Sequence, residues 1–294
     1  DDQGNTAEDF RIVQIYDKSP LNFSHATYLH STSSLHALIS DSETFFIGGT
    51  LVDDLKTSNS SLVAEQIQVQ SNELFIGELD TKLKNWNWII ELSGSDVKLG
   101  KIIHRDEHLY LVGTFSEKLT IGNKLIYSQY PRSLFLSKIT TDGDLLWTKT
   151  FHSNHTIEQL QIEVTKDDQI LLGGSFRGDI YFTDIESVES YDESLDIFLL
   201  KLNERGQVQN YAKFGKSGDN LLSGIACDEF GVTLATNVAK SGASSYGLLL
   251  LLDQLLQIKS YVSFESDNFS KCEFLKIAEN EIYLSCNYTD SLKM

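Results

Sequence analysis

Five short acidic segments recur along the chain, and they carry the residues best suited to chemistry. They are Asp41-Ser42-Glu43, Arg105-Asp106-Glu107, Lys166-Asp167-Asp168, Asp228-Glu229-Phe230 and Ala278-Glu279-Asn280, with nine carboxylates and two cations in total. Carboxylates gathered on one face attract cationic partners, and their oxygens are the ligands that Ca²⁺ takes. We predict a binding surface made of Asp41, Glu43, Asp106, Glu107, Asp167, Asp168, Asp228, Glu229 and Glu279.

Two alternatives to a binding surface stay open for these segments. Asp, Glu and Asn are common in turns because their side chains hydrogen-bond nearby main-chain groups. Calcium is a second alternative, but no segment has the ligand spacing of an EF-hand loop, so we assign no metal ligands and predict no required cofactor.

The patterns of nucleophilic catalysis are missing from the sequence. There is no Gly-x-Ser-x-Gly elbow, no His-x-x-x-His pair, and no identifiable histidine partner for Cys227. We therefore predict no catalytic residues and a protein that is not an enzyme. The alternative is a carbohydrate-active enzyme that holds two carboxylates, among candidates such as Asp41, Asp106 and Asp167, across an axial pocket.

Two of the three cysteines are placed to meet each other. Cys272 and Cys286 lie symmetrically about Ala278-Glu279-Asn280, so they face each other across a predicted hairpin. They form either a disulfide or two buried thiols. Cys227 is interpreted as a small apolar strand residue.

The elements that position the acidic segments follow a repeat. Gly49, Gly113, Gly174, Thr236 and Cys286 occupy one matching place, at intervals of 64, 61, 62 and 50 residues. Each unit contains four short apolar runs, many of them alternating with polar residues and separated by turn residues, which is the pattern of β-strands. Four-stranded units at such a period predict an all-β protein with the blades of a β-propeller.

The two ends of the chain complement each other in this repeat. Residues 10–23 match only the outer half of a unit, and residues 271–292 match only the inner half. We predict one domain over residues 1–294, closed by N- and C-terminal strands that share a blade. The predicted five blades are 31–94, 95–155, 156–217, 218–264, and a composite of 265–294 with 1–30. The alternative is an arc cut from a larger ring.

Charge and hydropathy limit the partners. The net charge of −18 disfavours nucleic acid and anionic membrane surfaces, and it favours cationic partners. The longest apolar run, residues 248–252, is far shorter than the roughly 18 residues of a membrane span, so we predict no membrane insertion.

Two units carry a family resemblance. In one unit the resemblance lies in Gly113-Thr114-Phe115, Ser133-Leu134-Phe135-Leu136-Ser137-Lys138-Ile139 and Asp142-Gly143-Asp144-Leu145-Leu146-Trp147. In the next it lies in Gly174-Ser175-Phe176 and Asp196-Ile197-Phe198-Leu199-Leu200-Lys201-Leu202. Both units resemble the SBBP-type β-propeller repeats of bacterial secreted and surface proteins. The resemblance implies a propeller and an extracellular, periplasmic or cell-surface location, and it brings no catalytic residues. The predicted function is a non-enzymatic binding or scaffold module for a protein or glycan. A structural spacer is a further alternative.

Overall fold

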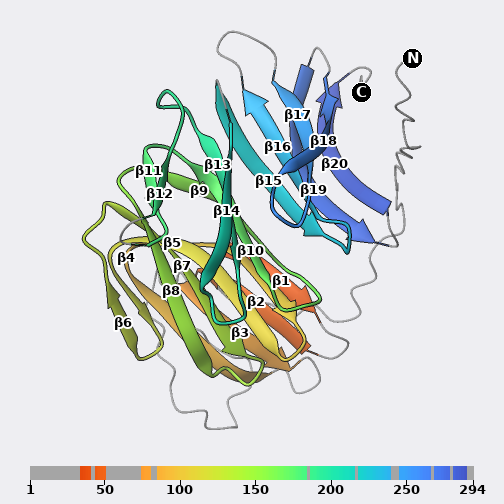
Figure 1. Ribbon diagram of the computed structural model, residues 1–294. Coiled ribbons are helices and arrows are strands. Elements are labelled where there is room, and N and C mark those ends of the chain that lie inside the picture. Colours follow the sequence, from red (N-terminus) through yellow and green to blue (C-terminus); the bar gives the residue numbers. More distant parts are fainter. Residues whose placement is uncertain are drawn as a thin grey trace, which may run out of the picture.

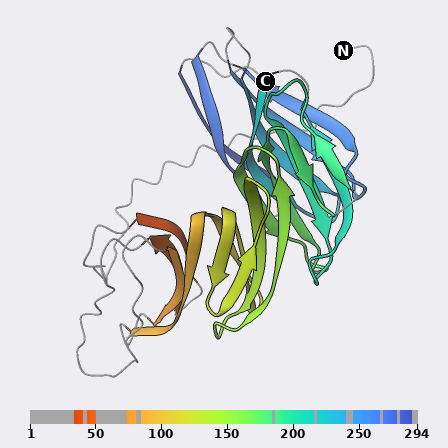
Figure 2. The same ribbon diagram turned by 90° about the vertical axis from the view of Figure 1, so that its left-hand side faces the viewer.

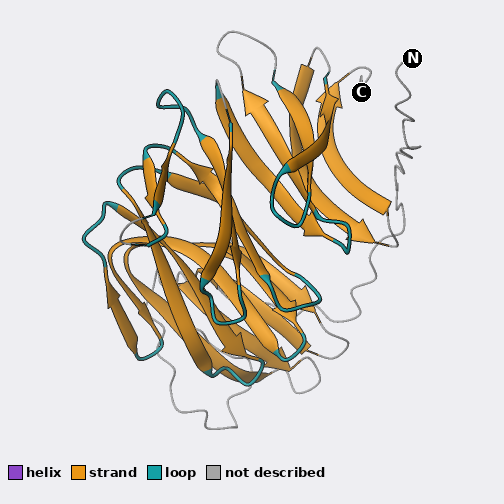
Figure 3. Cartoon of the chain, viewed as in Figure 1, coloured by secondary structure: helices purple, strands orange, loops and turns teal. Residues whose placement is uncertain are grey.

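The structure, a computed structural model, is an all-β arrangement of antiparallel strands joined by turns (Figure 3). It describes residues 34–40, 44–50, 74–80, 85–183, 186–215, 218–239, 245–265, 268–278 and 281–289. Within these ranges there is no helix, so none that could cross a membrane, and the predicted all-β class is confirmed. The predicted closing strand in residues 10–23 lies outside the described residues.

The strands nearest the N-terminus form two linked four-stranded units (Figure 1). Unit 1 contains β1 (Ser34–Ser40), β2 (Thr44–Thr50), β3 (Leu74–Asp80) and the beginning of β4 (Asn85–Arg105). The later part of β4 starts unit 2, which continues with β5 (His108–Ile121), β7 (Arg132–Thr140) and β8 (Leu145–Ser153), while β6 (Lys124–Tyr127) pairs with the end of β5. Because β4 pairs with both β3 and β5, units 1 and 2 share one continuous sheet.

The remaining strands repeat the same order. Unit 3 contains β9 (Ile157–Val164), β10 (Ile170–Phe176), β13 (Asp196–Leu202) and β14 (Val208–Phe214). Unit 4 contains β15 (Asp219–Cys227), β16 (Val232–Ala239), β17 (Tyr246–Leu252) and β18 (Ile258–Phe264). Unit 5 contains β19 (Asn268–Ala278) and β20 (Glu281–Thr289). A small hairpin, β11 (Asp179–Tyr181) and β12 (Ser187–Glu189), reaches back from unit 3 and pairs with the end of β8.

Successive units lie side by side in chain order, as the colours of Figure 2 show. The first strand of each unit contacts the first strand of the next, in the series β1, β4, β9, β15 and β19. None of the described sheets closes on itself. The number of blades and the closure of a ring therefore stay predictions.

The hydrophobic core lies between the faces of neighbouring units. Phe46 and Leu111 share a cluster between units 1 and 2, and Leu136 and Leu172 share one between units 2 and 3. All seven residues of β10 are buried, because this strand is covered on both faces. A continuous apolar run is the sequence pattern of such a strand.

Each first strand carries a β-bulge at the same level of the repeat. The shift in pairing falls between Leu35 and Ala37 in β1, Leu99 and Lys101 in β4, Gly173 and Ser175 of β10 against β9, Leu222 and Gly224 in β15, and Cys272 and Phe274 in β19. The bulge presses main chain against the matching repeat residue on the second strand. A Cβ on Gly113 would overlap the Lys98 carbonyl oxygen and lie 2.6 Å from the Phe135 ring. This close approach explains the glycine at this place in unit 2.

Tryptophans join the outer strands to the next unit. Trp88 donates a hydrogen bond of 2.8 Å to the Thr141 carbonyl oxygen and covers Gly143, whose φ is +91°. Trp147 covers Gly206, whose φ is +70°, in the same way one unit later. The third-strand turns are thus packed against the preceding unit.

Candidate functional site

The described acidic segments are turns at one end of the sheets, called here the turn end. Asp106 and Glu107 connect β4 to β5, Asp167 and Asp168 connect β9 to β10, and Asp228 and Glu229 follow β15. All of these side chains except that of Asp228 are exposed. Asp41, Glu43 and Glu279 lie outside the described residues.

The turns of units 2 and 3 lie near enough to act on a common histidine. Burial lowers the pKa of His108 in β5, and Lys138 lowers it further. The carboxylates of Glu107, Asp168 and Asp106 oppose this shift, and Asp168 belongs to the neighbouring unit. Carboxylates of two separate turns therefore contribute to the charge environment of one histidine.

One acidic residue of the turn end is used inside its own turn. Asp228 Oδ1 accepts hydrogen bonds from the main-chain N–H groups of Phe230, at 2.8 Å, and Gly231, at 3.1 Å. The side chains of Asp253 and Asn203 hold the third-strand turns in the same manner. The local-hydrogen-bond alternative therefore applies to Asp228.

The other acidic residues of the turn end are differently placed. Glu107, Asp167, Asp168 and Glu229 have no side-chain hydrogen bond or ion pair to any described residue, and Asp106 has one ion pair of 3.5 Å with Arg105. Their oxygens are open to solvent. No group of three or more His, Cys, Asp or Glu within the described ranges is arranged to hold a metal ion.

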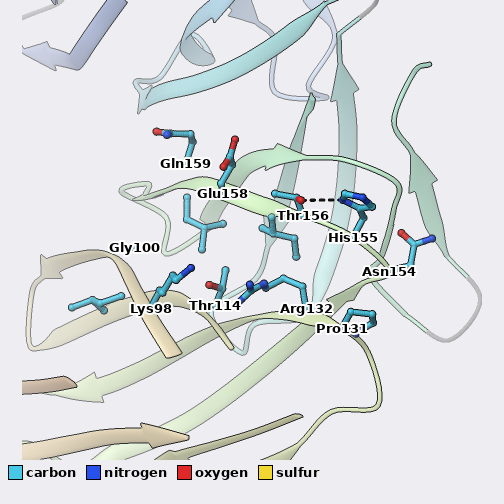
Figure 4. A pocket seen from close by; sticks show the side chains of 13 residues that line it. Lys98, Gly100, Thr114, Pro131, Arg132, Asn154, His155, Thr156, Glu158 and Gln159 are labelled. Carbon is cyan, nitrogen blue, oxygen red and sulfur yellow. Dashed lines mark hydrogen bonds between the residues drawn. The ribbon is translucent and has the colours of Figure 1, made fainter. Parts of the chain in front are cut away.

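A pocket of about 580 Å³ lies at the opposite end, between units 2 and 3 (Figure 4). Its walls are residues 98–100 of β4, Thr114 of β5, residues 131–132 and residues 154–160. The acidic turns contribute nothing to it. The candidate carboxylates of the enzyme alternative, Asp106 and Asp167, are thus on exposed turns away from this pocket. We call this end the pocket end.

A pair of cations forms one wall of the pocket. Arg132 Nη2 lies 2.6 Å from Asp96 Oδ2, and Lys98 Nζ lies 3.5 Å from Asp96 Oδ1. The Arg132 guanidinium lowers the pKa of Asp96 mainly by hydrogen bonding, so the carboxylate is ionised at neutral pH. Asp96 holds Arg132 in place and neutralises one of the two cations.

The neighbouring small hairpin fixes the rim of the pocket. Asn154 Nδ2 donates to Asp179 Oδ2 at 2.6 Å, and Asn154 Oδ1 accepts from the main-chain N–H of Asp179 at 2.7 Å. Gly178, with φ of +74°, lies so close that a Cβ there would collide with the Asn154 side chain. Asn154 is therefore positioned by β11.

Bulges in the first strands shape the opposite wall. Gln159 has a φ of +53° and is exposed, where β9 bulges against β10. Gly100, in the matching bulge of β4, faces Leu160 so closely that an added Cβ would be 3.0 Å from the Leu160 Cβ. The pocket thus exists where two bulged strands of adjacent units meet.

A polar contact lies beside the pocket, further along the same strands. Lys101 Nζ donates to Gln161 Oε1 at 2.8 Å. Burial lowers the pKa of Lys101 and raises the pKa of Glu163 on β9.

Burial also raises the pKa of the Cys227 thiol to about 12, so this thiol stays protonated at neutral pH and is a poor nucleophile.

The two other cysteines form a disulfide. Cys272 and Cys286 are directly opposite in the β19–β20 register and are bonded to each other. Asn237 of β16 binds the main chain of β19 at Cys272. Its side chain accepts a hydrogen bond from the Cys272 N–H at 2.6 Å and donates one to the Cys272 carbonyl oxygen at 3.0 Å. Of the two alternatives open from the sequence, the structure contains the disulfide.

The sequence reasoning did not select the residues of the pocket. Lys98 and Glu158 do occupy one repeat position, since Lys98 pairs with Thr114 and Glu158 pairs with Ser175. Placing the repeat units in register would have related these two residues. It would not have shown that two first strands meet around a cavity.

The comparisons with known proteins give no assignment. No protein-family model matches the chain, and no curated protein matches it. The resemblance to SBBP-type repeats accordingly stays a prediction.

Proposed function

We propose that this chain is a non-enzymatic β-propeller module that binds a protein or glycan partner outside the cytoplasm. In this proposal the consecutive four-stranded units are blades around an axis lined by their first strands. The series of contacts between β1, β4, β9, β15 and β19 supports it. The disulfide is compatible with an oxidising compartment.

The observation that carries the binding function is the contrast between rigid sheets and open turn carboxylates. Glu107, Asp167, Asp168 and Glu229 project from turns between buried strands and make no side-chain hydrogen bond or ion pair to a described residue. Fixed, solvated charges of one sign give complementarity to a cationic surface at little ordering cost. The net charge of −18 adds long-range attraction to the same partners.

Binding assays test this function. The chain is applied to a printed glycan array, to a lysine-rich peptide with its glutamine analogue, and to a panel of chromogenic glycosides. Binding without turnover is expected, and peptide binding should weaken at high salt and in the variant D167N/D168N. Turnover of a glycoside that is abolished by a carboxylate-to-amide change at Asp106 or Asp167 would show that the protein is an enzyme and not a binding module. If all three assays are negative, the structural spacer is the remaining alternative.

The closure of the propeller is tested separately. Deletion of residues 1–23 should lower the thermal stability, because the last blade would lose its outer strands and expose its core. An unchanged melting temperature would contradict closure.

A further inference from the structure

A largely buried threonine forms part of the wall of the pocket between units 2 and 3. Thr114 is only 6 % exposed as a whole residue, and its hydroxyl makes no hydrogen bond to a described residue. In Figure 4 it lies in the pocket wall between Lys98 and Arg132. The Thr114 hydroxyl is not among the fully buried unpaired atoms of the described residues, so it stays open to the pocket, where a ligand can donate to it or accept from it.

The charges of the pocket are balanced and separated. Lys98 and Arg132 stand on one wall, and Glu158 stands on the other (Figure 4). Asp96 neutralises one of the two cations through its ion pair with Arg132. A net charge near zero distinguishes this pocket from the rest of a chain with a charge of −18. With no net charge of its own, the pocket gives neither anions nor cations a net local attraction, and the overall field repels anions.

The lining offers hydrogen-bond donors and acceptors close together. Glu158 and Gln159 have no side-chain hydrogen bond within the described part of the chain, and Lys98 is restrained only by its 3.5 Å ion pair. Sugar hydroxyls donate and accept at once, so they satisfy such a mixed set. The volume of about 580 Å³ falls within the range of small-molecule sites, roughly 300–1,000 Å³.

We propose that the pocket formed by Lys98, Thr114, Arg132, Glu158 and Gln159 binds a neutral, hydroxyl-rich sugar residue of a glycan. The proposal rests on the function of the chain as a binding module, and it assigns the glycan to the pocket end rather than to the acidic turns. Asp96 and Asn154 are positioning residues, because they hold Arg132 and the rim in place.

The test uses the full chain on an array that carries neutral, sialylated, sulfated and uronic-acid glycans. The best neutral glycan is then titrated by calorimetry into the wild type and into the variants T114V and E158Q. We expect the affinity to fall roughly 5–10-fold in T114V, the loss of one hydrogen bond, and at least as much in E158Q. The matched controls T120V, on the same strand, and E189Q, on β12, should bind like the wild type.

Each other outcome overturns the assignment. Binding confined to charged glycans would contradict a neutral ligand, and unchanged affinity in both T114V and E158Q would contradict the pocket. Binding of the lysine-rich peptide alone would overturn the sugar site while leaving the module intact. Failure to bind either class of probe would overturn both. Circular dichroism of each variant verifies that a lost affinity is not lost folding, and the half-buried Glu158 provides a second variant if T114V fails to fold.

Discussion

Side chains at the two ends of the sheets make different kinds of bond. At the turn end, Asp253 accepts from N–H groups two and four residues further along the chain. At the pocket end, Asn154 bonds to Asp179, 25 residues away, and Arg132 reaches the Asp96 carbonyl, 36 residues away. The turns of the turn end are therefore shaped by local bonds of their acidic and amide side chains, although third-strand turns also accept bonds from the neighbouring unit, as Thr141 does from Trp88. The pocket end depends on several units being in place at once.

The largest expected effect concerns the bulge that supports the pocket wall. Gly113→Ala should lower the free energy of unfolding by about 3 kcal/mol, because the new Cβ overlaps the Lys98 carbonyl and the Phe135 ring. Thr236→Ala places the same side chain at the same repeat position in unit 4 and should cost about 1 kcal/mol. Denaturant unfolding measures both. Equal losses would show that the bulge of unit 2 tolerates a side chain.

Paired asparagine variants compare long-range and local bonds. Asn154→Ala should lower the unfolding free energy by about 2 kcal/mol, since one lost bond is to the carboxylate of Asp179. Asn203→Ala, which frees the N–H groups of Arg205 and Gln207, should cost about 1 kcal/mol.

Amide hydrogen exchange locates the two effects. We expect faster exchange at Asp179 and through the β11 hairpin for the Asn154 variant, but only inside one turn for the Asn203 variant. Spreading of the Asn203 effect beyond its turn would contradict the distinction between the ends.

Variants of two turn aspartates distinguish a carboxylate that stabilises its turn from one that is only exposed to solvent. Asp228→Ala should cost about 1 kcal/mol of stability, because two main-chain N–H groups lose their acceptor. Asp167→Ala should change stability by less than about 0.5 kcal/mol, since its side chain bonds to no described residue. Thermal melts at equal ionic strength test this. A stability loss in the Asp167 variant would indicate that this carboxylate supports the fold.

The smallest effect is the pH dependence of the pocket ion pair. The native pKa of Asp96 is lowered below its ordinary value of 3.8, so its contribution is complete above about pH 4 and is lost as the pH falls through the lowered pKa. Both partners are partly exposed, so the contribution is below about 1 kcal/mol. In Arg132→Gln, carboxyl NMR titration should show the Asp96 pKa rising toward 3.8, with a smaller rise in Lys98→Gln. An unchanged pKa in Arg132→Gln would rule out the ion pair in solution.

Much of the fold could be predicted because its signals are local. Apolar runs and turn residues act within a few positions, so they identify strands such as β10 and the turn at Gly143 without any tertiary contact. The symmetry of Cys272 and Cys286 about a turn likewise places the two cysteines opposite each other. The acidic turns were found for the same reason.

The pocket could not be predicted because no local pattern encodes it. A bulge adds one residue to a strand and re-aims the side chains after it, and the repeat alone gives no sign of that shift. The packing of β4 against β9 then decides that Lys98 and Glu158 face one cavity and that Thr114 is buried beside them. The sequence by itself determined the strands and the charge at their turns. Only the tertiary structure decided which polar groups lose water together, because that depends on contacts between units distant in the chain.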